Sequence, residues 1–253
     1  MSSSSSAAVA VPRRGRLDRI KAHSNPLSDQ QWPHPRDPSL QSWPAGFTQA
    51  HNLDLGCGFG GVTVALSALF PEQLSVGVEI RRKVVEYVAE RIAALQLRNA
   101  TVIASNGMKF LPHFFARGSL ERIFVLFPDP HFKKKNHRRR IVSRPLLAIY
   151  AHLLKLGGVL YTITDVKDLA DWMQTYCDAF PLFQRITDPA ELAADPCYAL
   201  IHTASEEAKK VDKAGGSKFP AIYRRVESVA DRADRLESER ESDTNAAVKR
   251  TAL

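Results

Sequence analysis

Cysteine is scarce in this sequence, and long hydrophobic runs do not occur in it. The three cysteines among the 253 residues, Cys57, Cys177 and Cys197, lie far apart and form no CxxC pair. This spacing excludes a disulfide framework and a zinc site, so we interpret the cysteines as reduced thiols of an intracellular protein without a metal ion. A membrane span needs about 18 consecutive apolar residues. No stretch approaches that length, and we expect no membrane partner.

The composition is that of a globular protein with an excess of basic residues. Hydrophobic residues make up 44% and charged residues 25% of the chain, which excludes a wholly disordered or fibrous protein. Lys and Arg number 35 against 27 Asp and Glu, so the formal net charge is +8. An excess of this size favours contact with a polyanion.

Both ends of the chain differ in composition from its middle. Residues 1–16 are rich in Ser and Ala and end in arginines, which predicts a disordered arm, although an organelle transit peptide has a similar composition. Residues 17–49 contain five prolines, which predicts an ordered or semi-ordered arm without a helix. Residues 227–253 are charged and lack aromatics, which predicts a disordered tail.

Between these arms, residues 50–226 alternate between strand and helix patterns. The predicted strands are 52–55, 74–80, 101–105, 122–127, 159–164 and an edge strand at 219–226. The predicted helices are 61–70, 82–97, a short proline-interrupted helix at 108–115, 145–156 closed by Gly157-Gly158, and 166–179. Apolar strands that alternate with helices indicate an α/β fold with a doubly wound, mostly parallel sheet.

A glycine-rich loop follows the first predicted strand. Gly56, Gly58 and Gly61 match G-x-G-x-x-G, and Glu79 ends the second strand, where a carboxylate can hold ribose hydroxyls. This pair fits NAD and S-adenosylmethionine alike, and a glycine turn without a ligand is the structural alternative. Asp54 favours S-adenosylmethionine, because a carboxylate before the loop suits its cationic amino-acid end and would repel a pyrophosphate.

Two further strand ends carry polar side chains. Asn106 ends the third strand and is expected either to hold the adenine edge of the cofactor or to form a turn before Gly107. Asp129 follows the fourth strand between Pro128 and Pro130, which restrict the backbone and direct the carboxylate.

A basic segment follows that turn. Residues 133–140 contain six Lys or Arg, with His131 just before them. A solvated face or a localisation signal would have the same composition. Because the segment begins beside a predicted catalytic strand end, we favour contact with a phosphate backbone.

These motifs together resemble the tRNA (guanine-N7)-methyltransferase family, and its eukaryotic branch in particular. FPDPHFK, D-x-G-C-G-F-G-G, V-E-I-R, AHSNP, SNGMKFLPHFF, YTITDVKDLADWM, TASEEAKK and FPAIYRR occur in the family's order over residues 17–226. The resemblance implies the class I S-adenosylmethionine-dependent methyltransferase fold with an antiparallel edge strand. It implies transfer of a methyl group from S-adenosylmethionine to N7 of a guanine in the variable loop of tRNA.

The resemblance also implies roles for individual residues. Asp129 falls on the catalytic aspartate, and Ser205, which replaces the usual Thr, forms a late cofactor clamp with Glu207. The other cofactor positions are Asp54, Gly56, Glu79, Ile80, Arg81, Asn106, Gly107 and Leu126, and the substrate positions are His131, Lys133 and Asp165. A non-catalytic WD-repeat subunit is the implied partner, and a nuclear location is expected, with the cytoplasm or an organelle as alternatives.

Three other functions share some of these features. A catalytically inactive, methyltransferase-like RNA-binding scaffold would not need Asp54, Glu79 and Asp129 together. A NAD-dependent oxidoreductase has no use for the basic segment, and a cap or small-molecule methyltransferase would lack FPDPHFK. Guanine N7 carries a lone pair, so we expect Asp129 to orient and stabilise the guanine rather than to act as a general base.

Overall fold

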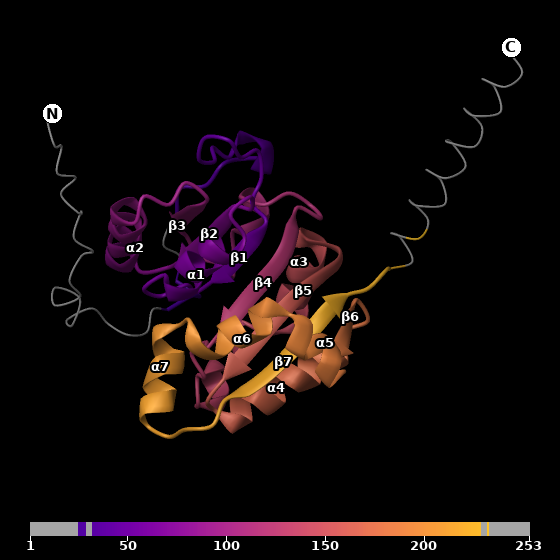
Figure 1. The fold of residues 1–253 in the computed structure, drawn as a ribbon. Helices are drawn as coiled ribbons and strands as arrows, with labels where there is room; N and C mark the ends of the chain where they lie inside the picture. Colours follow the sequence, from indigo (N-terminus) through magenta and orange to yellow (C-terminus); the bar gives the residue numbers. More distant parts are fainter. Residues whose placement is uncertain (1–24, 29–31, 229–231, 233–253) are drawn as a thin grey trace, which may run out of the picture.

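A central β-sheet lies between two layers of helices in the computed structural model, which describes residues 25–28, 32–228 and 232 (Figure 1). The predicted disordered arm at 1–16 and nearly all of the predicted tail at 227–253 lie outside the described residues. The described chain therefore comprises most of the proline-rich arm and the whole of the predicted domain at 50–226.

The sheet has seven strands. They are β1 (Asn52–Leu55), β2 (Ser75–Glu79), β3 (Ala100–Ala104), β4 (Leu120–Leu126), β5 (Leu154–Thr164), β6 (Phe183–Ile186) and β7 (Phe219–Arg225), in the order β3-β2-β1-β4-β5-β7-β6. Neighbouring strands from β3 to β5 pair in parallel, and β7 pairs antiparallel with both β5 and β6. This confirms the predicted fold class, a doubly wound and mostly parallel sheet with an antiparallel edge.

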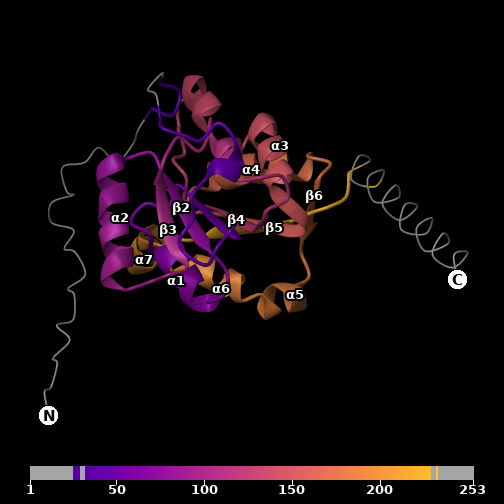
Figure 2. The same ribbon diagram turned by 90° about the horizontal axis from the view of Figure 1, so that it is seen from above.

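Helices cover both faces of the sheet, as Figure 2 shows. On one face, α1 and α6 pack against β4, β5 and β7, and on the other, α3 and α4 pack over the buried aliphatic side chains of β1, β4 and β5. The helices are α1 (Gly61–Leu69), α2 (Arg82–Ala94), α3 (Arg144–Leu153), α4 (Lys167–Asp178), α5 (Pro189–Ala194), α6 (Pro196–Thr203) and α7 (Glu206–Lys213), with 3-10 turns η2 (Pro38–Leu40), η3 (Leu111–His113) and η4 (Lys134–Arg139).

The predicted end of the third long helix is wrong. We expected a helix over 145–156 closed by Gly157-Gly158, but α3 ends at Leu153 and β5 begins at Leu154. Leu154 is fully buried and pairs with Leu120, and the register with β4 then shifts, so that Arg122 pairs with Val159. The glycine pair therefore lies in an irregular part of β5, where Gly157 adopts a positive φ of 78°.

Two further differences concern the sheet edge and a short helix. Residues 219–225 form an antiparallel strand as expected, but β6 lies outside it, so β7 is not itself the edge. The predicted helix at 108–115 is reduced to η3. Neither α5 nor α6 was predicted, although Asp188-Pro189 and Asp195-Pro196 are typical start signals of a helix. The side chains of Asp188 and Asp195 cap these helices by accepting backbone N–H bonds.

The described part of the proline-rich arm packs onto the domain. Trp32 is buried, and Trp43 and Phe47 pack against the larger core cluster. No helix among the described residues is long and apolar enough to cross a membrane.

Candidate active site

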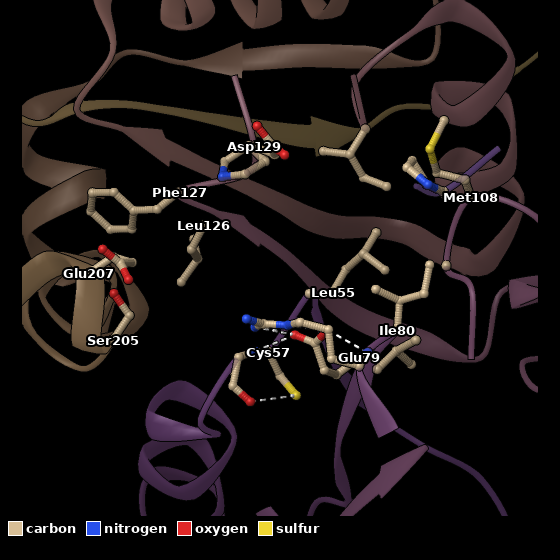
Figure 3. Close-up of a pocket in the computed structure, with 18 of the residues that line it drawn as sticks. Leu55, Cys57, Glu79, Ile80, Met108, Leu126, Phe127, Asp129, Ser205 and Glu207 are labelled. Atoms are coloured by element: carbon tan, nitrogen blue, oxygen red, sulfur yellow. Dashed lines mark hydrogen bonds and ion pairs between the residues drawn. The ribbon is translucent and has the colours of Figure 1, made fainter. Parts of the chain in front are cut away.

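A cavity of about 590 Å³ opens at the carboxyl ends of the parallel strands. The chain runs from β1 outward to β3 and then returns to β4, so the cavity lies at the point where the strand order reverses, the usual ligand site of such sheets. Figure 3 shows Asp129 facing Glu79 across this space, with Ser205 and Glu207 on one side and Met108 on the other.

The glycine-rich loop forms one wall of the cavity. Gly56 and Gly58 have φ angles of 76° and 53°, and a Cβ atom added at either would meet nothing within 4 Å, so the loop leaves open space for a ligand. Gly61 starts α1 and is needed for a different reason. A Cβ at Gly61 would lie 2.4 Å from the carbonyl oxygen of Ala204, so the late clamp region packs directly on the helix start.

Glu79 lies at the end of β2 with both carboxylate oxygens engaged. Oε1 accepts from the backbone N and the Nε of Arg81 at 2.9 and 3.1 Å, and Oε2 accepts from Arg81 Nη2 and Gly58 N at 3.0 and 3.2 Å. A carboxylate has about four acceptor sites. Because these bonds use all of them, a ligand hydroxyl can reach Glu79 only where the Arg81 side chain gives way.

Asp54 does not line the cavity. Its Oδ2 accepts from the backbone N and the Oγ1 of Thr63 at 3.0 and 2.8 Å, and only 3% of the residue is exposed. Burial raises the pKa of the Asp54 carboxyl to about 7, although the bonds from Thr63 act in the opposite direction. Asp54 therefore joins β1 to the first turn of α1, behind the loop that we expected it to flank.

Asn106 lines the cavity and also forms the turn that was the structural alternative. Its Oδ1 accepts from Met108 N at 3.0 Å, and its Nδ2 donates to the carbonyl of Pro26 at 2.7 Å, which draws the proline-rich arm to the cavity. The neighbouring hydroxyl of Ser105 is buried and has no hydrogen-bond partner among the described residues. It is a polar group that a ligand in this cavity can satisfy.

The turn that carries Asp129 has an unusual backbone. Phe127 and His131, on either side of the two prolines, have positive φ angles of 49° and 47°, which non-glycine residues rarely adopt. The Oδ1 of Asp129 accepts from His131 N at 3.3 Å, and its Oδ2 lies 3.7 Å from His131 Nδ1. The Asp129 side chain keeps 29% of its surface exposed, so it faces the cavity and can meet a substrate.

The basic segment divides between three environments. Lys133, Lys134, Lys135 and Arg138 are exposed and lie outside the cavity lining. Arg139 lines the cavity, and its buried Nε has no hydrogen-bond partner among the described residues. Arg140 is almost completely buried. The segment is thus not a uniform solvated face, because its last two arginines turn inward.

The late clamp lies at the start of α7. Ser205 caps this helix by accepting from Ala208 N at 3.0 Å, and Glu207 pairs with Lys210 at 2.7 Å. Between them, the buried Glu206 pairs with Arg91 of α2 at 3.1 Å, and Arg91 also donates to the carbonyl of Phe59 in the glycine loop at 2.8 Å. Arg91 and Glu206, more than a hundred positions apart in the sequence, thus connect α2 to the start of α7 beside the glycine loop.

Most of the residues predicted for the site meet at the cavity. Twelve of them line it: Gly56, Glu79, Ile80, Arg81, Asn106, Gly107, Leu126, Asp129, His131, Asp165, Ser205 and Glu207, whereas Asp54 and Lys133 do not. Sequence reasoning missed Pro26, Ser105, Arg139 and Glu206. Ser105 and Glu206 are adjacent to predicted residues and could have been found, but nothing local indicates that Pro26 reaches a residue 80 positions away. The described residues contain no cluster of three or more His, Cys, Asp or Glu that could hold a metal ion.

A doubly wound sheet with this strand order and an antiparallel β7, opening to a cavity over a glycine-rich loop, defines a class I S-adenosylmethionine-dependent methyltransferase. The family model described as putative methyltransferase matches residues 48–221. The chain belongs to the tRNA (guanine-N(7)-)-methyltransferase family, which confirms the resemblance noted in the sequence.

Relatives of that name come from plants, animals and yeast. The relative from Arabidopsis thaliana is 44% identical over an alignment of 243 residues, which covers 89% of this chain and 96% of the relative. The one from Yarrowia lipolytica is 44% identical and covers 87% of this chain and 80% of its own. A tRNA (guanine-N(7)-)-methyltransferase B from Xenopus tropicalis is 43% identical, with 87% and 98% covered.

Proposed function

We propose that this protein methylates N7 of a guanine in the variable loop of tRNA. The observation that supports this most directly is that Asp129 and Glu79 face the same cavity, and that the basic segment 133–140 begins at the end of the Asp129 turn. A methyl donor held by the glycine loop and a nucleotide held at Asp129 would then meet inside one space.

The cavity fits S-adenosylmethionine in size and in its polar groups. A volume of about 590 Å³ falls within the range of about 300–1,000 Å³ that is usual for small-molecule sites. We infer that the ribose hydroxyls replace the Arg81 side chain at Glu79, and that the adenine lies against Asn106 and the free hydroxyl of Ser105. Ser205 and Glu207 would close the opposite side.

In the proposed reaction, the main task of the protein is to orient guanine N7 and the methyl group. S-adenosylmethionine supplies an electrophilic methyl group, and guanine N7 supplies a lone pair, so no proton has to be removed before the transfer. Holding the reacting atoms in line removes much of the entropic barrier. The Asp129 carboxylate can accept from the N–H edge of the guanine and stabilise the positive charge that methylation places on the purine.

Several side chains around Asp129 suit an RNA substrate. The exposed Lys133 can contact a phosphate, and Arg139, His131 and Asp165 border the space that the guanine would occupy. Phe132 is 72% exposed within this basic stretch. An aromatic ring in such a position can stack on a neighbouring unpaired base, which is worth about 1–3 kcal/mol.

We further propose that the protein works with a non-catalytic WD-repeat subunit and acts in the nucleus. Both proposals rest on the family alone. Co-purification of a WD-repeat protein with the tagged chain, and the location of that chain in cells, test them separately.

The central experiment assays the purified chain, with and without a WD-repeat subunit, on tRNA with labelled S-adenosylmethionine. We expect label at a guanine of the variable loop, mapped by the strand scission that 7-methylguanosine permits, and none on a tRNA whose guanine there is replaced by adenine. Binding of both ligands without any transfer would instead identify a catalytically inactive scaffold. Transfer to another position would overturn the proposed site.

A further inference from the structure

The consecutive arginines Arg139 and Arg140 have opposite surroundings. Arg139 lines the cavity, whereas only 1% of Arg140 is exposed, and Arg140 is the largest of the fully buried side chains in the described residues. Burying a guanidinium is unfavourable unless its charge and its N–H groups find partners. The side chains and carbonyls around Arg140 must therefore compensate for the cost of burying its charge.

Three partners surround the Arg140 guanidinium. Its Nε donates to the carbonyl of Pro130 at 2.9 Å, and its Nη2 pairs with Oδ2 of Asp168 at 2.8 Å. The guanidinium carbon lies 4.7 Å from the centroid of the Trp172 ring, a distance suited to a cation–π contact. The Trp172 indole N–H in turn donates to the carbonyl of Val142 at 2.9 Å, which fixes the ring beneath the guanidinium.

The bond to Pro130 acts on the residue that follows Asp129. The positive φ angles of Phe127 and His131 make this turn unfavourable by itself, so hydrogen bonds from outside the turn must stabilise it. One such bond precedes Asp129, where Phe127 N donates to the carbonyl of Ile163 at 2.7 Å. The bond from Arg140 to Pro130 follows it, so the Asp129 turn is fixed on both sides.

We propose that Arg140 is a positioning residue that holds the Asp129 turn in its reactive geometry, a role that rests on the function proposed for Asp129. Arg140 joins the end of the basic segment to α4, through Asp168 and Trp172, and to the turn, through Pro130. Because its side chain is buried, Arg140 does not contact RNA, and its effect is on the rate of methyl transfer.

The test replaces Arg140 with Lys, which keeps the charge but cannot donate to Pro130 and Asp168 with a planar fork. The single-turnover rate is measured at saturating tRNA and cofactor and is expressed per cofactor-binding site. We expect this rate to fall about 10- to 100-fold, as for other small displacements of a reacting group. Affinities for S-adenosylmethionine and tRNA should stay unchanged. Addition of methylguanidinium to Arg140→Ala should restore part of the rate.

The matched control is Arg225→Lys. Arg225 is also buried, at 7% exposed, and its Nε also donates to a backbone carbonyl, that of Ala151, at 2.9 Å, but it lies at the opposite end of the sheet. We expect this variant to lose thermal stability and to keep its rate. An unchanged rate in Arg140→Lys, or an equal loss in both variants, would overturn the proposal.

A second measurement does not depend on activity. The NMR ring signals of His131, whose Nδ1 lies 3.7 Å from Asp129, should move in Arg140→Lys and stay in place in Arg225→Lys. Unmoved signals in Arg140→Lys would overturn the inference even if the wild type proved inactive on tRNA. That inactivity would by itself refute only the function proposed above.

Discussion

Glu79 is the residue that we propose to bind the ribose of the cofactor. Its carboxylate accepts from Arg81 and Gly58, so the proposed binding of the ribose would exchange one set of hydrogen bonds for another. The net contribution of Glu79 to the free energy of binding would then be the difference between its hydrogen bonds to the ribose hydroxyls and those to the charged Arg81 guanidinium. Such an exchange would allow both Arg81 and Glu79 to take part in the proposed cofactor site.

Glu79→Ala should weaken S-adenosylmethionine binding by about 1–3 kcal/mol, because two ribose hydroxyls would lose their acceptor in a partly buried site. Calorimetry on the purified chain measures this change directly. Glu72→Ala, an exposed glutamate between α1 and β2, is the matched control and should bind normally. Unchanged affinity in Glu79→Ala would remove this residue from the site.

At Asp129 the relevant change is from a carboxylate to an amide of the same shape. Asp129→Asn should lower the single-turnover rate by about 100-fold or more, because it removes the charge that we propose to stabilise the methylated purine. Cofactor affinity should be largely retained, since Asp129 lies across the cavity from Glu79 (Figure 3). A rate close to that of the wild type would refute the assignment.

At the scale of the elements, the connection between β1 and α1 differs from what we expected, because Asp54 does not line the cavity. Asp54 lies beneath the glycine loop, outside the cavity, and accepts two hydrogen bonds from Thr63 in the first turn of α1. These bonds stabilise the connection between β1 and α1. Burial raises its pKa to about 7, so below that pH the folded state favours the protonated carboxyl more strongly than the unfolded chain does.

This shift predicts a dependence of stability on pH. Between its ordinary pKa of 3.8 and about 7, Asp54 is protonated in the folded chain and ionised in the unfolded chain, so the folded state holds one more proton. Its contribution to the free energy of unfolding should therefore fall by about 1.4 kcal/mol for each pH unit as the pH rises through this window. Urea unfolding of the wild type and of Asp54→Asn measures it.

The difference between these two proteins isolates Asp54 from other titrating groups. We expect the wild type to lose stability relative to Asp54→Asn from about pH 4 to pH 7, and the difference to level off above this range. A constant difference across the window would show that Asp54 is ionised in the folded chain.

At the scale of the whole molecule, we expect the net charge of +8 and the exposed part of the basic segment to determine how strongly RNA is bound. Replacing Lys134, Lys135 and Arg138 with Ala should lower the affinity for all tRNAs to a similar extent, because phosphate contacts do not read the sequence. The affinity should also depend less steeply on salt concentration, because fewer counterions are released from the phosphates on binding. Filter binding at several salt concentrations measures the slope. Arg139 and Arg140 are left out because they turn inward.

The control for this experiment removes exposed basic residues elsewhere. Lys155 and Arg185 lie on β5 and β6, away from the carboxyl-end cavity, and replacing both with Ala should change the slope much less. Equal slopes for wild type and the triple variant would mean that the segment is a solvated face or a localisation signal.

Much of the fold and of the site could be predicted because the relevant signals are local. Apolar runs that alternate with helical spacing determine a doubly wound sheet, and strand ends in such a sheet converge at one edge. The spacing of Gly56 and Gly58, and the prolines around Asp129, restrict the backbone over a few residues. For this reason Glu79, Asn106 and Asp129 were placed at the cavity without any knowledge of tertiary contacts.

The tertiary structure alone decided where individual side chains point and what covers them. Asp54 turns from the cavity because Thr63 offers it two donors, and Gly157-Gly158 lies in a strand because Leu154 fills a buried position beside Leu120. Arg140 is separated from its exposed neighbours by its bond to Asp168, 28 positions away. Such outcomes depend on partners distant in sequence, whose packing a local pattern does not encode, whereas backbone geometry and strand order follow from each segment's own residues.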